Sequence, residues 1–129
     1  MKKICAAAVL ATLSAGAAAE WALVGGVENV FSAYADQATI RRDGSRVDMW
    51  GIYDFNNADM SIDGHKHFST KVLRQYDCGD PRVRLLSYLD YSGRMGAGQV
   101  IASNGDTRRW ETIVPGSVDE AFWKIACAI

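Results

Sequence analysis

Two histidines, His65 and His67, are the side chains whose type and spacing best suit metal chemistry. On a strand they would share one face, and Asp59 or Asp63 could supply a third ligand for zinc or copper. The competing interpretation is a pair of solvated histidines where a loop joins a strand. We favour it, because two ligands on a flexible stretch define no site, and we assign neither a metal nor a cofactor. A small periplasmic metal-binding or hydrolytic protein that uses His65 and His67 remains the alternative function.

The sequence places no nucleophile beside a base and an orienting acid. Both histidines belong to one stretch, so every Ser-His-Asp or Cys-His scheme would have to be built there. Carboxylate pairs such as Asp48 with Asp54, or Asp77 with Asp80, are compatible with hydrolysis but equally with turns and solvated faces. We therefore expect a protein that is not an enzyme and assign no catalytic residue.

Glycines and arginines offer two ways to hold an anion. Gly93, Gly96 and Gly98 superficially resemble a phosphate loop, but a strand rather than a helix is expected to follow, so a hairpin connection or bulge is favoured. The arginines fall into clusters that could gather in three dimensions and bind a sulfated glycan or an acidic protein. The competing interpretation is solvated sheet edges, where charge discourages aggregation. These clusters are Arg41, Arg42 and Arg46; Arg82 and Arg84; and Arg108 and Arg109.

The N-terminus predicts export. Residues 1–19 combine two lysines, a short apolar run and Ala17-Ala18-Ala19 as a cleavage site, which is typical of a secretory signal peptide. A lipoprotein would need a cysteine just after that run, whereas Cys5 lies at its start. We expect the signal peptide to be cleaved and residues 20–129 to form a single domain that is periplasmic or secreted and not lipid-anchored.

The two cysteines of the mature chain predict a disulfide. Cys5 leaves with the signal peptide, so Cys78 and Cys127 can form only one intramolecular pair. In an oxidising compartment a disulfide is the default expectation. A reactive or metal-binding pair is the alternative, but it lacks Cys-x-x-Cys spacing and neighbouring histidines.

The charge of the mature chain argues against a nucleic-acid partner. Without Lys2 and Lys3 the basic residues fall from 14 to 12 against 15 acidic ones, so the formal charge goes from −1 to −3. Nucleic-acid phosphates require a net basic surface. No second apolar stretch is long enough to span a membrane.

A short helix at the C-terminus, residues 115–129, is the element that the rest of the mature chain must accommodate. Ser117 and Glu120 have the spacing of a capping box. The apolar stripe consists of Val118, Phe122, Ile125 and Ile129, and Trp123 and Cys127 share an adjacent stripe.

The chain before the helix predicts strands joined by short turns, which pair antiparallel. Asp43-Gly44 is the clearest hairpin turn, Gly25-Gly26 stop the first strand, and residues 56–64 and 92–98 are loops. Large apolar side chains alternate on both faces of residues 46–55, so that strand is covered on both sides or exposes a sticky face. The expected strands are 21–24, 29–35, 37–42, 46–55, 66–78, 82–91, 99–103 and 110–114.

The side chains of two strands predict which face the helix covers. Cys78 ends a strand on the same side as Phe68, Val72 and Tyr76, so a disulfide to Cys127 would bring the helix to that face. Val83, Leu85, Leu89 and Tyr91 would lie together on one side of the next strand. Any function is then expected on the opposite face or in the loops.

A succession of short motifs runs through nearly the whole mature chain: Tyr34-x-Asp36 to Ile40-Arg41-Arg42, Val47-x-Met49-Trp50, Tyr76-Asp77-Cys78, Met95-Gly96-x-Gly98, Trp110 to Pro115-Gly116-Ser117, and Trp123-x-x-Ala126-Cys127. In this order they resemble the bacterial surface-adhesin protein E family. The resemblance implies an α+β fold, an antiparallel β-sheet with a C-terminal α-helix packed on one face and tethered by a disulfide. It also implies a cell-envelope location and, for the member that named the family, adhesion to host extracellular-matrix proteins. The adhesin pattern includes a lipidated N-terminus, for which this chain has no cysteine.

Residue pattern and resemblance together predict an exported, non-enzymatic binding or cell-envelope protein. A protein partner from the extracellular matrix or the envelope is expected to bind an exposed apolar or arginine-bearing surface of the sheet. No binding residue can be carried over from the resemblance.

Overall fold

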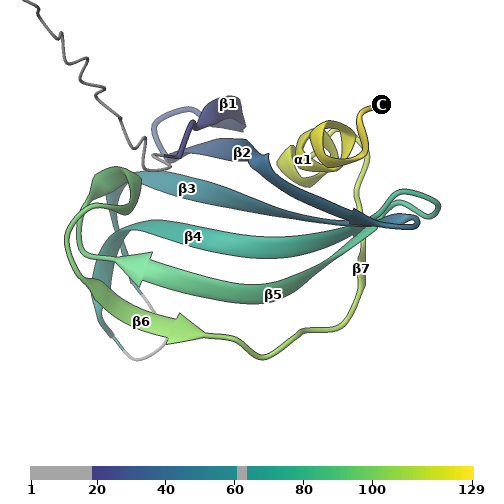
Figure 1. Cartoon of the computed structure of the whole chain (residues 1–129). Helices are drawn as coiled ribbons and strands as arrows, with labels where there is room; N and C mark the ends of the chain where they lie inside the picture. Colours follow the sequence, from purple (N-terminus) through teal and green to yellow (C-terminus); the bar gives the residue numbers. More distant parts are fainter. Residues whose placement is uncertain (1–18, 61–63) are drawn as a thin grey trace, which may run out of the picture.

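The computed structural model describes residues 19–60 and 64–129 of the chain (Figure 1). The predicted signal peptide, except Ala19, and the candidate ligand Asp63 lie outside the described residues. The strands follow one another across an antiparallel sheet in sequence order, so each pairs with its chain neighbour. They are β1 (Ala22–Val27), β2 (Phe31–Asp43), β3 (Arg46–Met60), β4 (Lys66–Asp77), β5 (Arg82–Tyr91) and β6 (Val100–Asn104).

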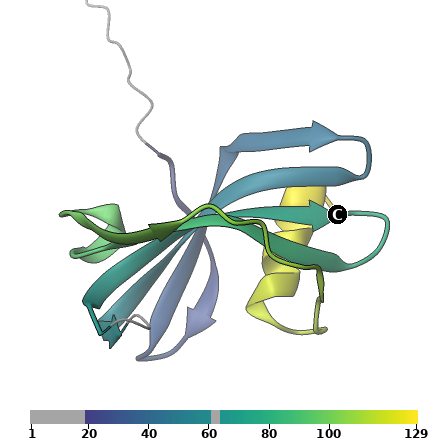
Figure 2. The same ribbon diagram turned by 90° about the horizontal axis from the view of Figure 1, so that it is seen from below.

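The chain after β6 returns along the free edge of β5. There β7 (Glu111–Thr112) pairs with the start of β5, and the helix α1 (Val118–Cys127) follows. Seen from below, this returning stretch passes in front of the strands while the helix lies behind them (Figure 2). The structure therefore confirms the α+β class and the antiparallel pairing. No helix in the described part of the chain is long and apolar enough to cross a membrane.

The hairpin at Asp43-Gly44 is confirmed. Asp43 pairs with Arg46 across a two-residue turn, and Gly44 has a φ of 64°. A side chain disfavours that left-handed conformation, which is why a glycine suits the turn.

Several strand predictions are wrong, and of residues 110–114 only Glu111–Thr112 form a strand, β7. β1 continues through Gly25-Gly26 to Val27, since a Cβ on Gly26 would lie 2.3 Å from the Phe31 carbonyl oxygen and the glycine permits a close approach of β2. Residues 29–35 and 37–42 form parts of one strand, β2, with an irregularity between Asp36 and Arg41. β3 extends to Met60, through residues that were predicted to be a loop.

The helix α1 covers the face of the sheet that carries the main core. Phe122, Ala126 and Cys127 are buried against Met49 and Tyr76. The predicted face of β4 is thus right for Tyr76, which lies under the helix. Phe68 and Val72, which were predicted on the same face, do not belong to this cluster. On the other face, Ile52 lies against Gly96 of the short 3₁₀ helix η1 (Arg94–Gly96). β3 is therefore covered on both sides.

A bulge in β5 changes which of its side chains share a face. Arg74 pairs with Leu85, whereas its neighbour Leu73 pairs with Ser87, so one extra residue stands in β5. Directly opposite residues lie on the same face of a sheet. Leu89, which pairs with Lys71 beyond the bulge, is therefore on the face away from α1, unlike Leu85. The predicted alternation fails at this point because period-two counting assumes an unbroken ladder.

Both ends of α1 differ in detail from the prediction. The Ser117 hydroxyl accepts a hydrogen bond from the Glu120 N–H (3.1 Å), as in a capping box. The Glu120 carboxylate, however, accepts from the Gly116 N–H (3.0 Å), since the Ser117 N–H donates to the Val114 carbonyl. At the other end Ala128 takes a φ of 56° and ends the helix. Ile129 therefore leaves the apolar stripe and is 70% exposed.

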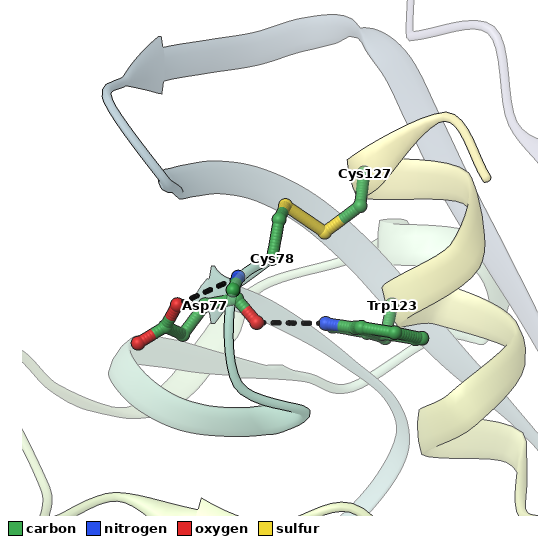
Figure 3. The surroundings of a disulfide bond; sticks show 5 residues. Asp77, Cys78, Trp123 and Cys127 are labelled. Carbon is green, nitrogen blue, oxygen red and sulfur yellow. Dashed lines mark hydrogen bonds between the residues drawn. A yellow bond between two sulfur atoms is a disulfide. The ribbon is translucent and has the colours of Figure 1, made fainter.

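The disulfide between Cys78 and Cys127 is present, with 5.6 Å between the Cα atoms (Figure 3). It joins the end of β4 to the last turn of α1. One turn earlier, the Trp123 indole N–H donates to the Asp77 carbonyl oxygen at 2.8 Å (Figure 3). The helix is thus attached to β4 by a covalent bond and a hydrogen bond to adjacent residues.

Candidate functional site

Arginines that are far apart in the sequence gather around one tryptophan, which we name the Trp110 cluster. The guanidinium carbons of Arg82 and Arg84 each lie 4.5 Å from the Trp110 ring centroid, and that of Arg46 lies at 5.3 Å. Arginine is attracted to the face of an indole at such distances. The cluster thus unites two of the three predicted arginine groups.

The sheet places this cluster on the face away from α1. Arg46 pairs with Asp77 across the sheet, and Asp77 pairs with Arg82. The three side chains form a row in which positive and negative charges alternate. Val47, Tyr76 and Val83 form the adjacent row, and they belong to the core under the helix. Because successive side chains of a strand point to opposite faces, the charged row lies on the other side.

A cavity of about 390 Å³ opens beside the cluster at the edge of β5. We name it the arginine cavity. Arg84 belongs both to this cavity and to the Trp110 cluster. The residues that line it are Arg74, Val83, Arg84, Leu85, Arg108, Arg109, Glu111 and Asp119.

The arginines of this region differ in how their charge is balanced. Arg82 forms an ion pair with Asp77 (3.0 Å), and Arg74 forms one with Asp119 (2.9 Å). Arg84 is held by a neutral partner, since its Nε and a terminal nitrogen donate to the Gln75 side-chain oxygen. Among residues 19–60 and 64–129, no carboxylate lies within ion-pair distance of three exposed arginines. These are Arg46, Arg108 and Arg109.

Asp77 is the acidic member of the charged row. Burial by itself raises the pKa of the Asp77 carboxyl, but hydrogen bonds from Arg82 and from the Gly79 N–H outweigh it and lower that pKa. Asp77 therefore stays ionised beside Arg82 and neutralises it. Of the arginines without such a partner, Arg108 and Arg109 line the cavity, and Arg46 belongs to the Trp110 cluster.

Arg74 connects the cavity to the core. Its guanidinium donates to the Tyr53 hydroxyl (2.7 Å) and lies over the Phe122 ring at 5.9 Å. Burial raises the pKa of both the Tyr53 and the Tyr76 phenols, and the positive charge of Arg74 offsets only part of that increase. These two phenols are therefore neutral in the folded protein at ordinary pH.

Alkaline titration is expected to expose this burial. The pKa of these phenols in the folded protein lies above the usual tyrosine value of about 10. Their contribution to stability is therefore fully present below about pH 10 and is lost as the pH rises through the folded-state pKa. Tyrosinate absorbance should therefore contain a late step that coincides with loss of ellipticity, and Tyr53→Phe should reduce its amplitude. An unreduced late step in this variant would contradict the assignment.

The two histidines do not form a site within the described residues. His65 is exposed before β4, whereas His67 is 5% exposed within β4, and its Nε2 lies 3.6 Å from the Asp90 carboxylate. Asp59 pairs with His67 across the β3–β4 ladder. Residues 19–60 and 64–129 contain no group of three side chains that could hold a metal ion. The structure thus gives the predicted metal alternative no further support.

The glycine-rich loop does hold an anion, but one that the chain supplies. The Asp54 carboxylate, 3% exposed as a residue, accepts hydrogen bonds from the Met95 N–H (2.7 Å) and from the Arg94 guanidinium. The Gly96 N–H donates to the Ser69 hydroxyl at 2.8 Å. These donors are therefore used within the fold, as the interpretation of a hairpin connection requires. Asp54 and Asp48 also have separate partners, since Asp48 accepts from Gln75 (2.9 Å).

Two residues of this site escaped the sequence analysis. Trp110 was named only as part of a strand and of a family motif, although its position directly after Arg108-Arg109 was a visible signal. Arg74 was given no role, and nothing in its sequence neighbours predicts its contact with Asp119, 45 residues away.

Known proteins resemble the chain in sequence pattern and in fold. A family model described as surface-adhesin protein E matches residues 21–128. Crystal form II of Haemophilus influenzae protein E is similar in fold, with a TM-score of 0.65 and 14% identity over 92% of this chain and 97% of that one. Another structure of Haemophilus influenzae protein E gives a TM-score of 0.63 and 16% identity over 95% and 91% of the two chains. No curated protein sequence matches the chain.

Proposed function

Because the chain belongs to the surface-adhesin protein E family, we propose that it is an exported, non-catalytic module that binds a protein of the host matrix or of the cell envelope. Membership of this family supports a role as a surface adhesin. The signal peptide predicted at residues 1–19 supports export to the periplasm or the medium.

The observation that carries the proposal is the concentration of unbalanced arginines at the edge of β5. Arg84, Arg108 and Arg109 line one cavity, and Glu111 is its only carboxylate outside the Arg74–Asp119 ion pair among the described residues. Arginine is enriched in protein interfaces, where its planar fork recognises oxygen anions. We therefore place the binding surface at the arginine cavity and the Trp110 cluster.

The rest of the sheet is less suited to this role. The helix α1 covers one face, and η1 covers part of the other. The formal charge of −3 on residues 20–129 would repel a polyanion at long range. Recognition of an acidic partner must therefore come from the local positive potential of the arginine region.

Binding of mature protein, residues 20–129, to immobilised matrix glycoproteins and envelope proteins tests the proposal. We expect saturable binding that weakens as salt rises, because surface charges are screened. Fractionation should find the protein in the periplasm or the medium. Absence of saturable binding to every matrix and envelope protein would overturn the proposed function.

A further inference from the structure

We propose that the arginine cavity binds sulfate groups of a sulfated glycan, such as the glycan chains that matrix glycoproteins carry. This inference rests on the proposed function and specifies the chemistry that the same surface recognises. It is argued from charge, from the rigidity of the lining residues, and from the shape of the anion.

The cavity has an excess of positive charge. The ion pair of Arg74 and Asp119 contributes no net charge. Arg84, Arg108 and Arg109 then face a single carboxylate, that of Glu111. Such an imbalance creates a local positive potential that attracts an anion.

The fold holds the guanidinium of Arg84 and the backbone of Arg108 in place before any ligand arrives. Arg84 donates through two nitrogens to the Gln75 side chain, which is itself fixed by Asp48. The backbone N–H of Arg108 donates to the Leu85 carbonyl oxygen at 2.8 Å. Binding groups that are already ordered lose less entropy when the ligand binds.

The size and floor of the cavity suit a saccharide unit. A volume of about 390 Å³ falls in the range of small-molecule sites, roughly 300–1,000 Å³. Val83 and Leu85 give the cavity an apolar floor on which the C–H groups of a sugar ring could lie. The polar and charged groups surround this floor, which is the arrangement expected for an amphipathic ligand.

Several separate guanidiniums favour a sulfate ester over a side-chain carboxylate. A carboxylate has two oxygens and is satisfied by the fork of one arginine. A sulfate ester has three terminal oxygens, so it can accept from two or three arginines that approach from different sides. Arg84, Arg108 and Arg109 come from β5 and from the segment before β7, so they approach the cavity from two elements.

The Trp110 cluster lies on the other side of β5 from the apolar residues of the cavity, because Val83 and Leu85 face α1 whereas Arg82 and Arg84 face away from it. Arg84 borders the cavity and also lies over the Trp110 ring, and Arg82 lies over the same ring. Residues two apart on a strand are separated by about 6.8 Å. A polymer with repeated sulfate groups that passes round the edge of β5 at Arg84 could contact the cavity and the cluster together, which a single small anion could not do.

The test is a titration of mature protein with a heparan-sulfate-type oligosaccharide of defined length. Arg108→Gln/Arg109→Gln should weaken binding at least tenfold and reduce the salt dependence by about two charges. Arg41→Gln/Arg42→Gln is the matched control, because it removes the same charge from another exposed adjacent pair that does not line the cavity. This control should change the affinity by less than about twofold, and Glu111→Gln should increase it severalfold.

Three outcomes would overturn the inference. Equal binding of the desulfated oligosaccharide would show that sulfate is not recognised. Equal losses in the two double-arginine variants would show that only overall charge matters. Stronger binding of polyglutamate or of phosphatidylglycerol vesicles, with the same dependence on Arg108 and Arg109, would assign the cavity to an acidic protein or to a membrane.

The same measurements separate this inference from the proposed function. If matrix or envelope proteins bind saturably but the sulfated oligosaccharide does not, the glycan assignment fails and the proposed function stands. If the oligosaccharide binds as predicted but no matrix or envelope protein does, the protein-binding proposal fails and the glycan assignment stands.

Discussion

Breaking the disulfide is expected to lower the free energy of unfolding by about 4 kcal/mol. Cys78 and Cys127 are 49 residues apart, and a cross-link of that span removes about this much chain entropy from the unfolded state. For a domain of this size the midpoint of thermal unfolding should fall by roughly 15–20 °C. The measurement is thermal unfolding of Cys127→Ser and of the wild type with and without reductant.

The Cys78→Ser/Cys127→Ser double variant is the control for this prediction. Reductant should shift the wild type but leave the double variant unchanged, since only the wild type has a bond to reduce. The indole hydrogen bond from Trp123 to Asp77 remains in both. If Cys127→Ser and reduction leave the transition unchanged, α1 is held by packing and this hydrogen bond alone.

Phe122→Ala is expected to destabilise the oxidised protein by about 3–5 kcal/mol, the usual result of emptying a buried aromatic site. Phe122 is 1% exposed, and its ring centroid lies 5.8 Å from that of Tyr53. Equilibrium unfolding in urea measures the change. Ile129→Ala is the matched control, because it truncates an exposed apolar residue that lies just beyond the end of α1. It should change the free energy of unfolding by less than about 0.5 kcal/mol.

A double-mutant cycle with Gly51 locates the effect of Phe122 on the sheet. A Cβ at position 51 would lie 2.9 Å from the Phe122 Cε1 atom, too close for an unchanged ring position. Gly51→Ala should therefore destabilise the wild type more than it destabilises Phe122→Ala. Since the Tyr34 carbonyl oxygen lies 3.2 Å from the same Cβ, part of the cost remains. Additive effects would contradict direct packing of Phe122 on Gly51.

Features that depend on neighbouring residues were predicted well from the sequence. The turn at Gly44, the Ser117 cap and the strand β5 follow from local sequence preferences, because a positive φ, a free N–H group and a two-residue alternation each involve a few adjacent residues. The disulfide followed from counting, since removal of the predicted signal peptide would leave only one pair of cysteines.

Features that depend on partners distant in the chain were missed. The bulge in β5 exists only in relation to β4, so alternation within β5 could not show that Leu89 faces away from Leu85. β1 passes through Gly26 because Phe31 of the next strand comes close. One local feature was missed as well: Ala128 adopts a left-handed conformation, so Ile129 leaves the apolar stripe.

The candidate site shows the same division. The sequence alone determined that the domain has arginine clusters, two cysteines after Cys5 and the motif order of its family. Only the tertiary structure decided which arginines meet, because antiparallel pairing places Arg46, Asp77 and Arg82 in one row and the returning chain lays Trp110 on it. It also decided which charges remain unbalanced, since ion pairing depends on distances of a few ångströms that residue spacing along the chain does not specify.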